Sequence, residues 1–171
     1  MKIGIKELKN IPLTAGQKLL LTGYIYTARD AAHKKLCELI INNKSIPIDL
    51  SMAVVYYAGP TEAKKGEIIG SCGPTTASRM DEYTEILMKN GLSATIGKGQ
   101  RSKKIINSIK KYNCPYLCAV GGVGALYNDK IKENVMVAFH ELGCESIKRL
   151  YIEDFPVFVG IDNQGKSIYN N

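Results

Sequence analysis

Apolar residues along this chain follow two different spacings. Short apolar or β-branched runs bounded by glycine or proline are typical of strands, whereas apolar residues three or four positions apart are typical of one helix face. Strand-like runs occupy residues 19–22, 24–26, 52–57, 67–70, 94–96, 115–120, 149–152 and 157–161. Helical spacing occupies residues 28–42, 78–90 and 102–112. Strands and helices alternate, but several strands follow one another directly, which predicts a mixed α/β sheet and not a purely parallel one.

Polar residues and glycine mark the ends of the predicted helices. Thr27 precedes the first helix and is a suitable N-cap. Ser78 and Asp81 have the spacing of a capping box at the start of the second helix, and Gly91 ends that helix.

The composition is that of an ordinary globular protein. The chain has 171 residues, of which 45% are hydrophobic and 23% charged, which excludes a disordered chain and a small disulfide scaffold. We expect a single domain over residues 1–171, because the length suits one sizeable core and no repeat or linker is visible. We expect no membrane span, since no uncharged run reaches the roughly 20 apolar residues that a spanning helix needs.

The five cysteines are an odd number and lack the spacing of a zinc site. The N-terminal residues show no secretory signal, so the cysteines indicate a reduced, cytoplasmic protein. Cys114 and Cys118 lie inside an apolar segment. We interpret them as core residues, with a metal site as the alternative.

The chain is basic, with 23 Lys and Arg against 16 Asp and Glu and a net charge of +7. A nucleic-acid-binding module is therefore one hypothesis. The densest basic run, which includes Arg101, lies on and before the third predicted helix, whose opposite face is apolar. We expect such a run to be a solvated helix face and not a nucleic-acid surface.

Three segments share a design in which a strand ends, polar residues follow, and a helix or turn begins. They are residues 27–30, 73–81 and 97–99. Backbone N–H groups at a helix start favour anions, and an arginine can bind a carboxylate with two hydrogen bonds. Arg29, Arg79 and Lys98 together predict a site for a small dianion.

Each of these features also has a purely structural explanation. Arg29 and Asp30 can form a surface ion pair, Thr75 and Thr76 can cap a helix, and the Gly-Lys-Gly run can be a simple turn. His33 is expected to be a hydrogen-bonding residue of the helix face more than a catalytic base. The phosphate-binding pattern GxxxxGK[ST] is absent.

Five motifs along the chain resemble signatures of the class I, iron–sulfur-dependent fumarate hydratases and L-tartrate dehydratases. They are YTARDAAHK at 26–34, YAGPT at 57–61, GPTTASRMD at 73–81, IGKG at 96–99 and EDFP at 153–156. The motifs occur in the family's order. The chain resembles the family's β subunit, which is equivalent to the C-terminal domain of single-chain members, and this resemblance implies a swivelling β/β/α fold with a mixed central sheet.

The resemblance implies a hydro-lyase that hydrates fumarate to L-malate reversibly, with dehydration of L(+)-tartrate to oxaloacetate as the alternative. It implies a 4Fe-4S cluster held by three cysteines of an α subunit, and no cofactor or metal on this chain. The β subunit would be inactive alone and would assemble with the α subunit as a heterotetramer. A non-catalytic scaffold is a third hypothesis, against which the intact motifs speak.

The resemblance also implies roles for individual residues. Arg29, Arg79 and Lys98 would bind the carboxylates of a small dicarboxylate substrate, and Thr75 would hydrogen-bond the substrate. Thr76 would be the base, with Arg79 as its catalytic neighbour. A hydroxyl is a poor base unless a neighbour lowers its pKa, and Arg79 or an acid of the α subunit could do so.

Overall fold

The computed structural model describes residues 1–122 and 124–169. Its strands are β1 (Lys2–Gly4), β2 (Lys18–Thr27), β3 (Val54–Tyr56), β4 (Ala94–Gly97), β5 (Tyr116–Cys118), β6 (Ile131–Ala138) and β7 (Ile147–Ile161). Its helices are α1 (Asp30–Ile41), α2 (Asp81–Lys89), α3 (Lys103–Tyr112) and α4 (Gly124–Asn128), with 3-10 turns η1 (Ile5–Glu7), η2 (Ala77–Met80) and η3 (His140–Glu145). None of these helices has both the length and the apolar character needed to cross a lipid bilayer.

The strands form one seven-stranded sheet in the order β1-β2-β3-β4-β5-β7-β6, and a further pairing of β2 with β7 closes it into a barrel-like ring. Strands β2 to β5 are parallel to one another, whereas β7 is antiparallel to β2, β5 and β6. The ring closes because β7, with 15 residues, pairs with β2 along most of its length and with β5 near its C-terminal end, whereas β6 pairs with the other end of β7 outside the ring. The predicted α/β fold with a mixed central sheet, of the swivelling β/β/α type, is confirmed.

Two strands that the sequence divides are continuous in the structure. The runs at 19–22 and 24–26 both belong to β2, whose pairing with β7 shifts register between Leu21 and Gly23. Gly23 has φ +133°, and a Cβ there would lie 3.1 Å from the Ile5 side chain. The C-terminal runs join as β7 across Asp154, whose φ is +48°. Local backbone irregularities therefore bend these strands without ending them.

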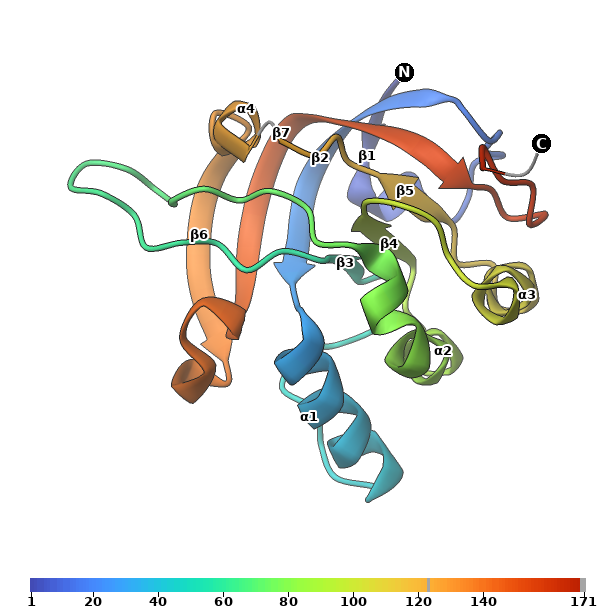
Figure 1. Ribbon diagram of the computed structural model, residues 1–171, viewed down its shortest axis with the longest axis horizontal. Helices are drawn as coiled ribbons and strands as arrows, with labels where there is room; N and C mark the ends of the chain where they lie inside the picture. The colour runs from blue at the N-terminus through green and yellow to red at the C-terminus, as the bar shows by residue number, and fades with distance from the viewer. Residues whose placement is uncertain (123, 170–171) are drawn as a thin grey trace.

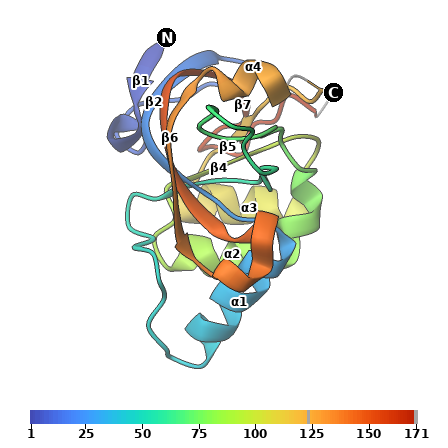
Figure 2. The same cartoon turned by 90° about the vertical axis from the view of Figure 1, so that its left-hand side faces the viewer.

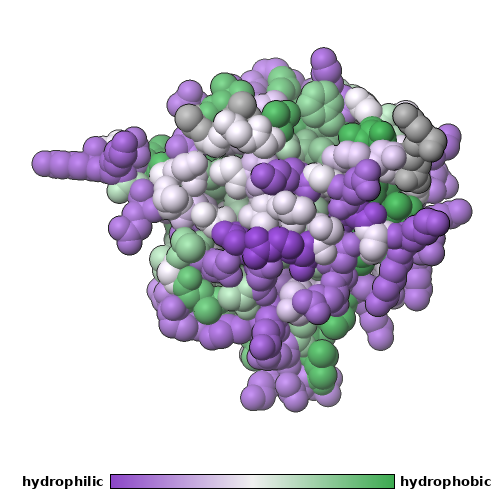
Figure 3. Space-filling model, in the orientation of Figure 1, coloured by the Kyte–Doolittle hydropathy of each residue, from purple (hydrophilic) through white to green (hydrophobic). Residues whose placement is uncertain are grey.

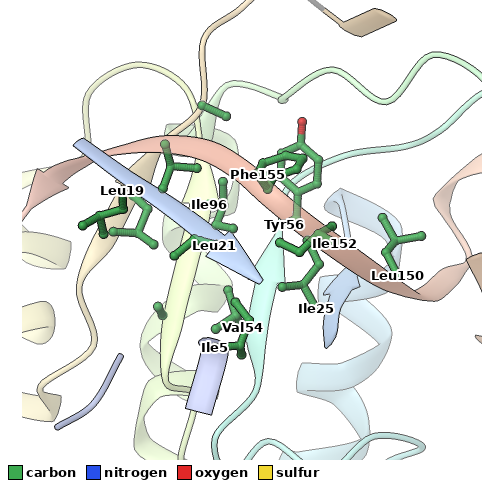
Figure 4. Packing of buried hydrophobic residues seen from close by; sticks show 14 of the residues in the cluster. Ile5, Leu19, Leu21, Ile25, Val54, Tyr56, Ile96, Leu150, Ile152 and Phe155 are labelled. Carbon is green, nitrogen blue, oxygen red and sulfur yellow. The ribbon is translucent and has the colours of Figure 1, made fainter. Parts of the chain in front are cut away.

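Two apolar clusters lie on the two sides of the strands. One fills the interior of the ring, where Tyr56 and Phe155 pack with aliphatic side chains of β2, β3, β4 and β7 (Figure 4). The other lies between the sheet and the helices α1, α2 and α3, which gather on one side of the molecule (Figures 1 and 2). Cys114 and Cys118 are buried in this second cluster, as predicted for core residues.

Phe155 is expected to be a main contributor to the interior of the ring. Its ring is fully buried and stacks on Tyr127 at 4.5 Å between centroids. Phe155→Ala should therefore lower the free energy of unfolding by about 3–5 kcal/mol, measured by urea unfolding followed by circular dichroism. Val135→Ala, at a position that is 44% exposed, is the control and should change it by less than about 0.5 kcal/mol. Equal effects of the two variants would show that the ring has no packed interior.

The strand predicted at residues 67–70 is wrong. These residues lie in an irregular, largely exposed arm that projects from the body of the protein (Figures 1 and 3). Ile68, whose apolar character suggested a strand, is 49% exposed. The base of the arm is held by hydrogen bonds between Thr61 and Ser71. Strand β6 was not predicted from the sequence. It is largely exposed and its register shifts twice against β7, so its apolar residues do not alternate regularly.

Two predicted helix caps are also wrong. Thr27 is a buried residue of β2, and its hydroxyl accepts a hydrogen bond from the Lys148 amide, so α1 begins after Arg29. Ser78 and Asp81 do not form the predicted capping box, because the Asp81 carboxylate accepts hydrogen bonds from the Arg101 guanidinium and the Ser102 amide. In both cases a tertiary contact uses the group that local sequence suggested for a cap.

Candidate functional site

The predicted site residues lie where four parallel strands end. Because β2, β3, β4 and β5 run in one direction, their carboxyl ends meet at the same edge of the sheet, the usual place for a ligand site in α/β proteins. Arg29 follows β2, and Lys98 follows β4 directly. The segment after the arm returns to this edge, where the Thr75 amide donates to the carbonyl of Tyr57 at 2.6 Å.

Thr75, Thr76 and Lys98 are brought together by backbone hydrogen bonds. The Lys98 amide donates to the Thr75 carbonyl at 3.2 Å, and the Ala77 amide donates to the Lys98 carbonyl at 2.8 Å. These two bonds form a parallel bridge between Thr76 and Lys98. Thr75 is half-buried, whereas Thr76 and Lys98 are exposed. Thr76 also starts the turn η2, which carries Arg79.

Arg29 and Arg79 meet at the carboxylate of Asp30. Arg79 donates through Nε to Asp30 Oδ1 at 3.0 Å, and a terminal nitrogen of Arg29 lies 3.7 Å from Asp30 Oδ2. The second partner of Arg29 is Glu145, at 3.3 Å. The Arg29 and Arg79 side chains are 23% and 52% exposed, so both remain within reach of a ligand. The surface ion pair considered for Arg29 and Asp30 is thus one part of a larger cluster.

Two polar atoms of this cluster are buried without a hydrogen-bond partner among the described residues. They are Nε of Arg29, a donor, and Oδ2 of Asp30, an acceptor. Buried polar atoms are nearly always paired in native proteins. The cluster thus contains one donor and one acceptor that the described residues leave unused.

Two glycines lie against the side chains of Arg29 and Lys98, where a larger residue would take up the space of these cations. A Cβ at Gly59 would lie 2.9 Å from Cδ of Arg29, and a Cβ at Gly121 would lie 3.3 Å from Cδ of Lys98. Any side chain at Gly59 would therefore displace Arg29. The absence of a side chain at the glycine of the YAGPT motif and in the double-glycine turn therefore allows Arg29 and Lys98 to take their positions at the sheet edge.

Glu145 and Lys148 belong to the site's support and were missed in the sequence. Glu145 accepts from the Ala31 amide at 3.0 Å as well as pairing with Arg29, so it occupies an amide at the start of α1 that was expected to be open to an anion. Lys148 is buried and donates to Ser146 and to carbonyls of η3, the turn that carries Glu145. Burial lowers the pKa of Lys148. No local motif surrounds either residue. Glu145 reaches Arg29 only because the turn η3, which precedes β7, lies beside the start of α1.

His33 lies beneath the site as a buried, hydrogen-bonded residue, as predicted. Its Nδ1 lies 2.9 Å from the Arg29 carbonyl, which can only accept, so Nδ1 carries the proton. Its ring meets Tyr57 edge-on at 5.3 Å. Burial lowers the pKa of His33 to about 4, and the imidazole is therefore neutral at physiological pH.

This low pKa predicts a loss of stability in mild acid. The unfolded chain binds a proton at His33 near pH 6.5, whereas the folded chain does so only near pH 4. Lowering the pH from 7 to 5 should therefore cost about 2 kcal/mol of unfolding free energy through this group. His33→Gln should remove that part of the pH dependence in urea titrations, and His140→Gln, at an exposed position, should not. A pH dependence unchanged in His33→Gln would contradict the assignment.

The cysteines of the chain do not form a cluster-binding set. In the described ranges, no three His, Cys, Asp or Glu side chains converge as metal ligands. Burial raises the pKa of Cys37 to about 11 and the pKa of Cys72 and Cys114 to about 12. Cys144 is exposed and lies in η3, whereas the other four cysteines are buried in other segments. These thiols do not fit an iron–sulfur cluster, which needs several converging thiolates.

The basic run does not form one continuous surface. Helix α3 packs through Ile105 and Ile109 and exposes its lysines, as predicted for a solvated face. The prediction is wrong for Arg101, whose side chain is fully buried and pairs with Asp81 at 2.6 Å.

Residues 4–171 match the protein family described as Fumarase C-terminus. Fumarate hydratase 2 of Leishmania major is 38% identical over 167 residues, which are 96% of this chain and 29% of that protein. The anaerobic class I fumarate hydratase of Escherichia coli K12 is 39% identical over 171 residues, which are 99% of this chain and 31% of that protein. The chain thus spans about a third of the length of these two relatives.

A third relative is similar in length to the chain. The protein of Methanocaldococcus jannaschii named "Putative L(+)-tartrate dehydratase subunit beta" is 37% identical over 174 residues. The match covers 98% of this chain and 88% of that protein.

Proposed function

The chain belongs to the Fumarase C-terminus family, and on that premise we propose that it is the β subunit of a hydro-lyase that hydrates fumarate to L-malate. Its part of the active site would bind the carboxylates of the substrate and transfer a proton. The observation that supports this most is the meeting of Arg29 and Arg79 at Asp30, beside the bridge between Thr76 and Lys98.

The reaction explains why cations are needed at this edge. In the dehydration direction, a base removes a proton from the carbon beside one carboxylate, and the electron pair moves into that carboxylate. The resulting aci-carboxylate has two negative charges. Fixed positive groups stabilise such a charge as it develops, and one such group contributes about 10²- to 10³-fold in rate. In this proposal Arg29, Arg79 and Lys98 surround that carboxylate.

The two threonines have different positions and different proposed roles. Thr75, which is half-buried and bonded to Tyr57 through its amide, would hydrogen-bond the substrate. Thr76, which is exposed at the start of the turn that carries Arg79, would exchange the proton with the substrate carbon. A positive neighbour such as Arg79 favours the ionised form of a hydroxyl.

The remaining part of the active site is assigned to a partner. We propose that a separate α subunit holds a 4Fe-4S cluster and assembles with this chain as a heterotetramer. The relative of Methanocaldococcus jannaschii whose name is that of a subunit beta supports a two-chain enzyme. The five free cysteines support a reducing compartment, the cytoplasm.

Dehydration of L(+)-tartrate is the second candidate, because the relative of matching length has that name. L-Malate and L(+)-tartrate, the diacids that would be dehydrated, both have four carbons and differ by one hydroxyl group, which a site distinguishes through a specific hydrogen bond. Three cations at one edge suit either substrate.

The test is to mix the purified chain with its cluster-bearing partner under anaerobic conditions and to follow fumarate, malate and tartrate. The proposal expects interconversion of fumarate and malate by the mixture, and none by either chain alone. Preferred consumption of L(+)-tartrate would select the second candidate. Activity of this chain alone would refute the division of labour, and a mixture inert toward all three diacids would refute the proposed function.

A further inference from the structure

Arg101 is the most completely buried charged group near the site, although the sequence suggested a solvated residue. Its guanidinium donates to Asp81 at 2.6 Å, to the Thr84 hydroxyl at 2.9 Å, to the Tyr57 hydroxyl at 3.3 Å and to the Thr95 hydroxyl at 3.4 Å. Burial lowers the pKa of Arg101, but the neighbouring Tyr57 and Asp81 raise it by more, so the group stays charged. A buried cation with this many directed bonds fixes the elements that supply its partners.

One set of contacts reaches the turn that carries Lys98. Arg101 follows that turn in the sequence and lies over the Tyr116 ring at 5.1 Å. The Tyr116 hydroxyl in turn donates to the Gly99 carbonyl at 2.9 Å. Arg101 is thus connected to the lysine turn in two ways, through the backbone that joins them and through Tyr116.

A second set reaches the threonines. Arg101 bonds the Tyr57 hydroxyl and lies over the Tyr57 ring at 5.4 Å. The backbone of Tyr57 accepts from the Thr75 amide and donates to the Ile96 carbonyl. A shift of the Tyr57 ring would therefore move the strand end on which Thr75 rests.

A third set reaches Arg79. Asp81 directly follows the turn η2 that carries Arg79 and is the first residue of α2. Thr84, the other partner on α2, donates its hydroxyl to the carbonyl of Met80, the last residue of η2. Arg101 thus holds the arginine turn from the same central position.

We infer that Arg101 is a positioning residue, which keeps Thr75, Thr76, Arg79 and Lys98 in a common geometry from beneath the sheet edge. The expected effect of Arg101 on catalysis rests on the proposed function, whereas its expected effect on the geometry of the site segments does not. Three site segments that are separate in sequence share this one guanidinium, which touches none of the site's exposed groups.

The first test is Arg101→Lys, with Lys103→Met, an exposed position on α3, as the control. Lysine keeps the charge but lacks the planar fork that serves several acceptors at once. Amide hydrogen exchange of the full chain should become about tenfold faster at residues 75–79 and 97–99 and stay unchanged in β2. In the assembled enzyme, kcat should fall by about 10²-fold, since small displacements of catalytic groups cost rate steeply.

The second test separates positioning from stability. Arg101→Met leaves the Asp81 carboxylate, which is 15% exposed, without its cationic partner, and the double variant Arg101→Met with Asp81→Asn removes that charge as well. The double variant should regain much of the melting temperature that the single variant loses, while kcat stays low. Recovery of kcat together with the melting temperature would overturn the inference, because Arg101 would then act through stability alone.

Unchanged exchange and unchanged kcat in Arg101→Lys would also overturn it, and this variant decides the question if the methionine variants do not fold. Lys103→Met should match the wild type in both measurements. If the wild-type assembly hydrates no fumarate, the proposed function fails, and the exchange measurement on the chain still tests the positioning of the site segments.

Discussion

Replacing Lys98 by methionine is expected to lower kcat/KM for fumarate hydration by the assembled enzyme by about 10²- to 10³-fold. Methionine keeps most of the length of the side chain and removes only the ammonium group, so the turn and its bridge to Thr76 should persist. The loss should appear in kcat as well as in KM, because in the proposed site the ammonium would face a charge that becomes larger in the transition state. Initial rates over a range of fumarate concentrations measure both.

The control for this change is the same substitution at another lysine. Lys103→Met removes an exposed ammonium from α3 and should leave kcat/KM within a factor of about two, as expected for a surface substitution. If Lys98→Met and Lys103→Met have equal activities, the lysine turn takes no part in the reaction.

The second large effect is expected at Thr76. Thr76→Val keeps the shape of the side chain and removes the hydroxyl, and kcat should fall by about 10²- to 10⁴-fold, the usual contribution of a positioned acid or base. Thr75→Val would remove the hydrogen bond that we propose between Thr75 and the substrate, and should cost about tenfold in kcat/KM. Thr76→Ser, which retains the hydroxyl, should recover most of the activity.

These three variants rank the two threonines directly. A larger loss of kcat in Thr75→Val than in Thr76→Val would transfer the proton-exchanging role to Thr75. Near-normal turnover in both valine variants would remove threonine from the proton transfer altogether. Melting temperatures of the variants should stay close to that of the wild type, because Thr76 is exposed and Thr75 only half-buried.

The sequence predicts the repetitive part of the fold well. Helices α2 and α3 and strands β4 and β5 have clear apolar periodicity bounded by turn residues, and all four occur where they are expected. The mixed sheet also follows from successive strand-like runs. Closure of the ring does not, because it depends on β7 pairing with both β2 and β5, and such long-range pairing has no local signal.

The site residues likewise divide into those with a local sequence signal and those placed only by long-range contacts. Arg29, Arg79 and Lys98 are visible in the sequence because each follows a strand or opens a turn, and parallel strands bring such positions to one edge. Glu145 and Arg101 are not visible. Arg101 lies in a run of lysines, and only the acceptors of α2, β3 and β4 around it account for its burial.

The most direct measurement of the central claim is a crystal structure of the assembled enzyme with malate bound. We expect one malate carboxylate to lie within about 3 Å of the Arg29 and Arg79 guanidinium groups and of Lys98 Nζ. Malate held only by residues of the partner subunit, with these three cations turned to solvent, would contradict it.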